Sequence, residues 1–159
     1  MVWRTVYRLL GRHDDALDCY QETFLAAYRA SSGRPVEHWP SFLATLAARR
    51  AIDRLRSRVR QRAQFAPLDD VPEPVDAGDS PVDLAEGSER LEQVRILLAA
   101  LPPKQAEVFW LACVEDLPHR AIADQMQIGA GEVRVLLHRA RARLRAALGP
   151  CLPDPRTSR

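Results

Sequence analysis

The sequence LPHRAIADQMQIGAGEVRVLLHRARARLR, residues 117–145, predicts two helices joined by a short turn. The first helix is expected to run from about Pro118 to Met126, because a proline suits the first helical turn, where its missing N–H would have no partner. Three apolar residues recur at the spacing that faces a core: Ala121, Ile122 and Met126. The segment QIG, residues 127–129, then interrupts the helical period.

The second helix of this pair is expected from Ala130 to Leu148. Its inward stripe is continuous and apolar: Val133, Leu137, Ala140, Leu144 and Leu148. Its basic side chains point elsewhere: Arg134, His138, Arg139, Arg141 and Arg145. A short helix braced across the first half of a longer one is the helix-turn-helix plan, whose second helix enters the major groove of DNA. An ordinary helical hairpin with a solvated face is the alternative, and the single sign of the charge favours DNA binding.

Charge is distributed unevenly along the chain. Residues 1–62 carry a net charge of +6, residues 63–89 carry −8, and residues 90–159 carry +4, whereas the whole chain carries only +2. Two basic modules separated by an acidic segment indicate a polyanionic partner that is contacted at two places.

The acidic segment also divides the 159 residues of the chain. Residues 63–87 contain four prolines and many aspartates, and such a composition cannot bury enough apolar surface to fold alone. We therefore expect an all-α protein with small helical domains at 1–62 and 88–149. The segment 63–87 would be a flexible acidic linker between two separately folding modules, and residues 150–159 would form a disordered tail.

Cysteine usage gives no sign of a metal site or a disulfide framework. Cys19, Cys113 and Cys151 are odd in number and far apart, with no C-x-x-C pair and no histidine at ligand spacing. We expect buried free thiols and no cofactor or metal. The sequence has neither a signal peptide nor an apolar run long enough to cross a membrane, so a cytoplasmic protein is expected.

Two helices are expected before residue 30, at Val2–Leu10, with Gly11 ending the helix, and at Asp14–Arg29. The second should bury six residues: Ala16, Cys19, Tyr20, Thr23, Phe24 and Ala27. Its opposite stripe is mostly acidic or polar: Asp14, Asp18, Gln21, Glu22, Leu25 and Arg29. Such a stripe is often only solvated, but in a basic protein it suggests a protein partner rather than nucleic acid.

A third helix, expected from about Pro40 to Arg62, carries seven arginines from position 49 onward. Its first turns are apolar nearly all round and should be buried: Phe42, Leu43, Leu46 and Ala47. An inward stripe then follows: Ala48, Ala51, Ile52, Leu55 and Val59. The other side is basic, with Asp53 as its only opposite charge: Arg49, Arg50, Arg54 and Arg56. Contacts of such arginines to phosphates give affinity that falls steeply with salt. Trp39 could stack on an unpaired base or cap the core, and the core role is slightly favoured.

The order of these parts resembles the bacterial RNA polymerase sigma factors of the extracytoplasmic-function subfamily of the sigma-70 family, which have only regions 2 and 4. DDALDCYQETFLAAYRA, residues 14–30, is similar to the family's polymerase-binding helix, and SFLATLAARRAIDRLRSR, residues 41–58, to its promoter-melting helix. Residues 88–148 are similar to region 4 nearly end to end. The motifs QETF, AIDRLR, LPPKQAEVF and LHRARARLR in this order are highly specific.

The resemblance implies a non-enzymatic subunit that binds core RNA polymerase and directs promoter recognition and melting. Contacts with the clamp helices of the largest polymerase subunit are expected at Asp14, Asp18, Gln21, Glu22 and Leu25. The −10 element should be engaged and opened by Trp39, Arg49, Arg50 and Arg54. The −35 element should be contacted by Arg120, Gly131, Glu132, Arg134, Val135, Leu136, His138 and Arg139. An anti-sigma protein is a further partner class, which the sequence leaves open.

The chain departs from the family's pattern at several places. It begins inside the family's first helix, so either part of the first core-binding segment is missing or the start codon is misplaced. Arg49 stands where asparagine is common and Leu136 where arginine is common, so base preferences cannot be copied from relatives. Gln127 replaces the usual turn glycine, and Gly129 is expected to relieve the same strain.

A dimeric helix-turn-helix regulator that does not bind polymerase is the main alternative. It accounts for residues 103–148 equally well, but it leaves the acidic helix face, the arginine-rich helix and the linker without a role. A nucleic-acid enzyme is disfavoured, because four scattered histidines and no clustered carboxylates near the basic helices make no catalytic set.

Overall fold

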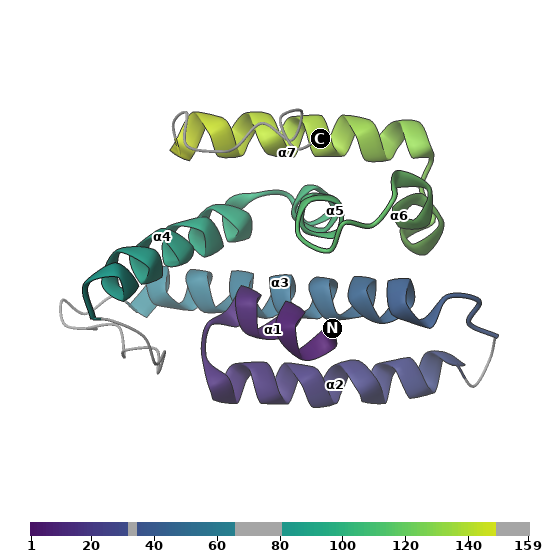
Figure 1. Ribbon diagram of the computed structural model, residues 1–159, viewed down its shortest axis with the longest axis horizontal. Coiled ribbons are helices and arrows are strands. Elements are labelled where there is room, and N and C mark those ends of the chain that lie inside the picture. The colour runs from purple at the N-terminus through teal and green to yellow at the C-terminus, as the bar shows by residue number, and fades with distance from the viewer. Residues whose placement is uncertain (32–34, 66–80, 149–159) are drawn as a thin grey trace.

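The protein is built from helices in the computed structural model, which describes residues 1–31, 35–65 and 81–148, except for the side chains of 65 and 81–90 (Figure 1). These ranges contain seven helices and no strand, so the expected all-α class is confirmed. The helices are α1 Val2–Leu10, α2 His13–Ser31, α3 Trp39–Phe65, α4 Pro81–Ala100, α5 Pro103–Cys113, α6 His119–Met126 and α7 Ala130–Leu148. Within the described ranges, no helix is both long and apolar enough to cross a membrane.

Helices α1, α2 and α3 pack on one another and form the first half of the fold. Helix α1 has the predicted bounds and buries Val6 and Leu9 completely. It ends because Gly11 adopts the left-handed conformation, with φ at 71°, and donates its N–H to the carbonyl of Tyr7. Helix α2 runs antiparallel to α3 in this half, along the side of the molecule away from α7 (Figure 1).

The buried face of α2 is narrower than predicted. Its centre is buried as expected, at Ala16, Cys19, Thr23 and Ala27. Tyr20 is only partly buried, and Phe24 is 42% exposed, so the prediction that Phe24 belongs to the core is wrong. The four small central residues bring α2 close to its neighbours, and the two rings at the edge of the stripe are left to pack on each other, with centroids 4.8 Å apart.

The two described cysteines differ in environment. Cys19 is buried as expected, and burial raises its thiol pKa to about 11. Cys113 is exposed, contrary to the expectation of a buried thiol, because it is the last residue of α5 and lies at the end of the buried face. Cys151 lies outside the described residues.

Helix α3 is the central element, because it contacts every other helix of the first half and also α4, α5 and α6. Its buried stripe is largely alanine, at Ala44, Ala47, Ala48 and Ala51, and continues through Ile52 and Leu55. Ala47 is buried as predicted, but Phe42, Leu43 and Leu46 are only partly buried, which corrects the prediction for those three residues. Small residues along the stripe allow helices to approach closely, so the larger side chains lie at its margins.

Helices α4 to α7 form the second half and pack directly onto the first. Figure 1 shows the layers in order: α2, then α3 with α1, then α5 and α6, and finally α7. Helix α5 is buried at every position from Gln105 to Leu111, since it contacts α3 on one side and α7 on the other. Buried residues of both halves form one continuous core. The two halves are therefore packed on each other in this structure, and separate folding of the two modules stays a prediction.

The ends of the expected linker are helical. Helix α3 continues through residues 63–65, where alanine and glutamine favour a helix, and α4 already begins at Pro81. Proline is well tolerated at the first position of a helix, which explains why this proline begins a helix rather than extending the linker. The remainder of the expected linker, residues 66–80, and the expected tail, 150–159, lie outside the described residues.

Candidate nucleic-acid interface

Helices α6 and α7 form the predicted helix-turn-helix, in which α6 buries Ile122 and Ala123. Pro118 precedes the first helical residue rather than occupying the first turn. The turn depends on Gln127, which adopts the left-handed conformation with φ at 54° and ψ at 46°. The prediction that Gly129 relieves the strain is wrong, because its φ is not positive and Gln127 itself takes the left-handed position. The backbone N–H of Ile128, the residue after Gln127, donates to the carbonyl of Ala123 at 3.0 Å, and this hydrogen bond closes the end of α6.

Helix α7 presents one apolar and one basic face. The predicted inward stripe is confirmed at Val133, Leu137, Ala140 and Leu144, and Leu148 is partly buried. Most residues predicted to contact the −35 element are exposed: Arg120, Gly131, Glu132, Arg134, Val135, His138 and Arg139. Leu136 is instead partly buried and packs against the core. Glu132 lies 3.6 Å from the ammonium group of Lys104 in an exposed ion pair.

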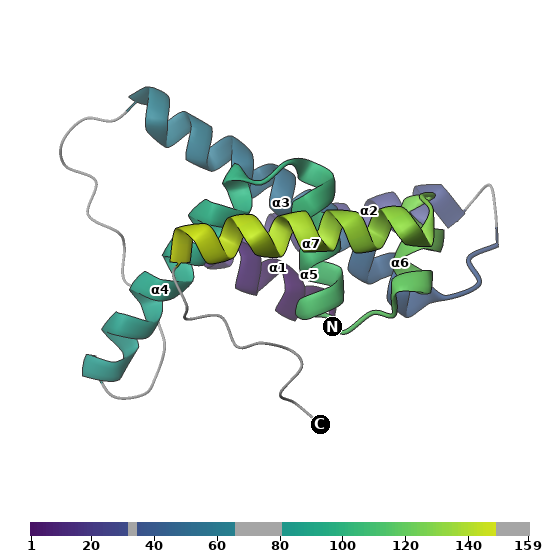
Figure 2. The same ribbon diagram turned by 90° about the horizontal axis from the view of Figure 1, so that it is seen from above.

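The basic face of α7 is open to a large ligand. Viewed from above, α7 runs across the top of the other helices and no described helix covers it (Figure 2). A side-chain carbon added at Gly131 would meet nothing within 4 Å, so a groove wall or phosphate could approach the backbone there. Exposed arginines on the first turns of the second helix are the groups that this motif uses for base edges and phosphates.

A second exposed surface lies on α2. Every residue predicted there to bind polymerase is exposed: Asp14, Asp18, Gln21, Glu22 and Leu25. The structure adds three exposed apolar residues next to them, Leu17, Phe24 and Tyr28, which sequence reasoning missed. Their spacing at i, i+7 and i+11 is a signal that could have revealed a common face. Acidic and apolar side chains side by side are suited to a protein partner.

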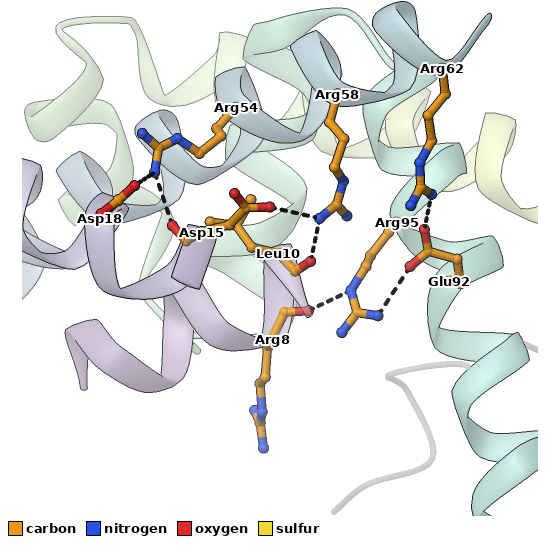
Figure 3. Close-up of polar contacts among 9 residues, drawn as sticks. All are labelled: Arg8, Leu10, Asp15, Asp18, Arg54, Arg58, Arg62, Glu92 and Arg95. Carbon is orange, nitrogen blue, oxygen red and sulfur yellow. Dashed lines mark hydrogen bonds and ion pairs between the residues drawn. The ribbon is translucent and has the colours of Figure 1, made fainter. Parts of the chain in front are cut away.

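Two arginines of α3 are paired with the acidic side of α2. Arg54 donates to Glu22 at 3.0 Å. It also donates to the carbonyl of Asp15 at 3.0 Å and lies 3.9 Å from Asp18 (Figure 3). Arg50 lies 3.9 Å from Glu22. Two of the acids predicted to bind polymerase, Asp18 and Glu22, are therefore ion-paired with Arg50 and Arg54, two of the arginines predicted to bind DNA.

Arg49 points to the other side of α3 and pairs with Glu107 of α5 at 3.2 Å. The Glu107 side chain is only 7% exposed, whereas that of Arg49 is 49% exposed. Burial raises the pKa of the Glu107 carboxyl, and the Arg49 charge opposes that shift. Asp53 is the only acid that α3 carries among its described side chains, but α2 and α5 supply the opposite charges that the sequence of this helix does not reveal.

Further along α3, three arginines stabilise the fold. Arg58 donates to the carbonyl of Leu10 at 2.8 Å and lies 3.3 Å from Asp15 (Figure 3). Arg56 donates to the carbonyl of Leu101 at 2.8 Å. Arg62 lies 3.4 Å from Glu92, at the far end of the helix.

Trp39 lies on the surface at the start of α3. Its side chain is 44% exposed, and its ring meets that of Phe42 edge-on at 6.0 Å. The favoured interpretation of Trp39 as a core cap is therefore wrong, and its exposed ring is available for stacking.

The sequence matches two family profiles in the order that the fold displays. Residues 1–61 match Sigma-70 region 2, and residues 91–144 match Sigma-70, region 4. The structure is similar to the sigma factor RpoE of Bartonella quintana, crystallised with the anti-sigma factor NepR. That similarity has a TM-score of 0.59 at 18% identity and covers 95% of this chain and 91% of the other. At this identity it shows a common fold.

Curated relatives extend the match across most of the chain. The ECF RNA polymerase sigma factor ShbA of Streptomyces griseus is 32% identical over 135 residues, which are 81% of this chain and 69% of that protein. SigE of Mycolicibacterium smegmatis is 28% identical over 91% of this chain, and SigD of Mycobacterium tuberculosis is 34% identical over 77%. The matches span only 56% of SigE and 55% of SigD. With both regions in order and identity at this level over most of its length, the chain belongs to the extracytoplasmic-function RNA polymerase sigma factors of the sigma-70 family.

Proposed function

We propose that this chain is an initiation subunit that binds core RNA polymerase and directs promoter recognition and melting. The observation that carries the proposal is that one chain presents an acidic and apolar surface on α2 together with a basic helix-turn-helix on α6 and α7. A subunit that recruits polymerase to a promoter needs both surfaces. The polymerase supplies the catalytic chemistry, so no catalytic residue is assigned to this chain.

We assign polymerase binding to the exposed side of α2. The acidic and polar residues of the prediction would face the clamp helices of the largest subunit, and Leu17, Phe24 and Tyr28 would add apolar contact area. At a protein interface, burial of apolar side chains supplies binding free energy, and the charged side chains next to them orient the partner.

We assign the two promoter elements to the two halves of the fold. Helix α7 would enter the major groove at the −35 element through its exposed first turns. Helix α3, with Arg49, Arg50 and Arg54, would contact the −10 element, and the exposed Trp39 would stack on an unpaired base.

Transcription in vitro with purified core enzyme tests the proposal directly. Core enzyme plus this chain should initiate at defined sites in a genomic promoter library, and core enzyme alone should not. A dimeric regulator would instead form a dimer in solution and bind duplex DNA without polymerase. Absence of any transcript that depends on this chain would contradict the proposed function.

An anti-sigma protein is a further proposed partner. The RpoE of similar fold was crystallised with such a protein, and the α2 surface here is exposed enough to be covered by one. A candidate anti-sigma protein should compete with core enzyme for this chain in a binding assay, and simultaneous binding of both would argue against this assignment.

A further inference from the structure

Val135 is an apolar residue on the outward face of α7. Its side chain is 48% exposed, and among the side chains that the structure describes on this helix it is the only large apolar one that is exposed. Single exposed apolar residues are common on protein surfaces and need no explanation by themselves. The place of Val135 on the helix, however, gives it a specific use.

The side chain of Val135 points almost directly away from the core. It lies about 140–180° around the helix axis from every residue of the buried stripe: Val133, Leu137, Ala140 and Leu144. Four exposed residues lie within about 60° of it: Gly131, Glu132, His138 and Arg139. Val135 is therefore at the centre of the face that α7 turns outward.

The position of Val135 along α7 also brings it to the bases. It lies about 7.5 Å along the axis from the start of the helix, and the first turns of a recognition helix are those that approach base edges. A side-chain carbon added at Gly131, one turn earlier on the same face, would meet nothing within 4 Å. No described helix covers this side of α7, so DNA can approach the backbone next to Val135 closely (Figure 2).

The chemistry of the valine side chain limits what it can recognise. It has neither a donor nor an acceptor, so it cannot bond to the polar groups that distinguish base pairs in the major groove. The apolar group that a base pair presents there is the C5-methyl of thymine, and 5-methylcytosine carries the same methyl at the same ring position. A β-branched side chain in a helix is held in one χ1 rotamer, so the two γ-methyl groups of Val135 have a fixed position against which a C5-methyl can pack.

We propose that Val135 recognises the C5-methyl group of one pyrimidine in the −35 element, and that this contact selects thymine or 5-methylcytosine over cytosine at that position. Methylation of a cytosine at C5 would then change which promoters the chain recognises. The inference rests on the proposed function, because it takes α7 to enter the major groove. It adds an apolar contact to the hydrogen bonds expected from the arginines of this helix.

Exchange of thymine for uracil tests the contact, because uracil differs from thymine only in lacking the C5-methyl. The preferred duplex is first selected from a random pool by the full-length chain, alone and with core enzyme. Each thymine of that duplex is then replaced singly by uracil, and the affinity is measured at constant salt. The wild type should lose about fourfold in affinity at one position and nothing elsewhere, since burial of one methyl group contributes about this factor.

Three variants separate this contact from a general effect on α7. Val135→Ser removes both γ-methyl groups and should abolish the difference between thymine and uracil, whereas Val135→Ile keeps a β-branched apolar side chain and should retain it. Ala142→Ser is the matched control, because Ala142 is exposed and lies about 20° from Val135 around the axis, two turns further along. It should also retain the difference. Both positions are exposed, so circular dichroism should show wild-type helicity for each variant.

A second set of duplexes distinguishes the two sources of the methyl group. The sensitive thymine is replaced by cytosine or by 5-methylcytosine. If the wild type binds the methylated cytosine about fourfold more tightly than cytosine, the methyl group is recognised in both bases. A difference confined to thymine and uracil would restrict the inference to thymine.

The inference and the proposed function fail in different ways. Equal binding of thymine and uracil duplexes at every position would overturn the inference and leave the proposed function standing. A difference that persists in Val135→Ser would overturn the role of Val135. Absence of any preferred sequence in both selections would overturn the inference together with promoter recognition by α7. A chain that shows the difference in binding but starts no transcript with core enzyme would refute the initiation role alone.

Discussion

Arg134 and Arg139 of α7 are expected to have different roles in reading DNA. They are five residues apart, which places them about 140° apart around the helix axis and about 7.5 Å apart along it. Arg134 lies in the second turn after the helix begins at Ala130, the part of a recognition helix that enters the groove most deeply. We therefore assign Arg134 to a base edge and Arg139 to a phosphate.

The expected magnitudes follow from these assignments. Both side chains are exposed, so each alanine substitution should change the free energy of unfolding by less than about 0.5 kcal/mol. Loss of a bidentate base contact costs about 1–3 kcal/mol, which is a 5- to 150-fold loss of preference at one base pair. Loss of a phosphate contact should weaken all promoters alike and lower the slope of log affinity against log salt by about one unit.

Promoter profiling in vitro separates the two substitutions. Arg134→Ala should relax preference at one position of the −35 element, whereas Arg139→Ala should leave the preference pattern intact. Arg145→Ala is the control, because Arg145 is exposed and lies on the same side as Arg134, three turns further along. Uniform loss of activity in both test variants, with unchanged preferences, would refute the base-reading role of Arg134.

Three further predictions concern polymerase binding, the turn and the buried carboxyl. Gln21→Ala combined with Glu22→Lys should weaken binding of core polymerase roughly tenfold or more in a pull-down while the fold persists, because both side chains are exposed; undiminished binding would argue against this surface. Gln127→Gly should raise the free energy of unfolding by up to about 1 kcal/mol in thermal melting, since it relieves the left-handed strain; a lower melting temperature would contradict that. Burial raises the pKa of Glu107, so its protonated carboxyl stabilises the fold below the ordinary glutamate pKa of 4.5, and this stabilisation is lost as the pH rises through the raised pKa. At pH 7 the carboxyl is charged and buried, so Glu107→Gln should melt at a higher temperature than the wild type. The half-exposed Arg49 would lose its partner at little cost, and an unchanged or lower melting temperature would mean that the ion pair outweighs the burial of the carboxylate.

The sequence predicted the helices and their buried stripes better than it predicted the residues at the margins of these stripes and in the turns. Helix α1 and the helix α7 stripe follow from periodicity because one wide apolar face decides which side of a helix is buried. Phe24 was misplaced because it lies at the margin of such a face, where periodicity cannot tell a packed ring from an exposed one. Gln127 could not be assigned because glycine is the usual left-handed residue, and only the backbone shows which position takes that conformation.

The prediction that Arg49 and Arg54 of α3 lie on one face of the helix is wrong, although their spacing in the sequence already separates them. Arg49 and Arg54 are five residues apart, hence about 140° apart around the axis, and cannot share one face. In the structure Arg54 turns to α2, whereas Arg49 turns to α5. Arg58 follows Leu55 at i+3, at the margin of the inward stripe, and its side chain is only 14% exposed. The partners themselves, on other helices, are not encoded in the local pattern.

The arrangement of charges links fold stability to the proposed function. Arg49, Arg50 and Arg54 are ion-paired with carboxylates of α2 and α5, so a DNA phosphate would compete with these carboxylates for the arginines. A polymerase surface that binds Glu22 would remove the ion-pair partner of Arg50 and one of the partners of Arg54, which would keep its contacts with Asp15 and Asp18. Binding of polymerase to α2 and exposure of the basic face of α3 are then coupled through shared ion pairs. On the proposed function, polymerase binding at α2 would make Arg50 available to DNA without any change in the helices that carry these charges.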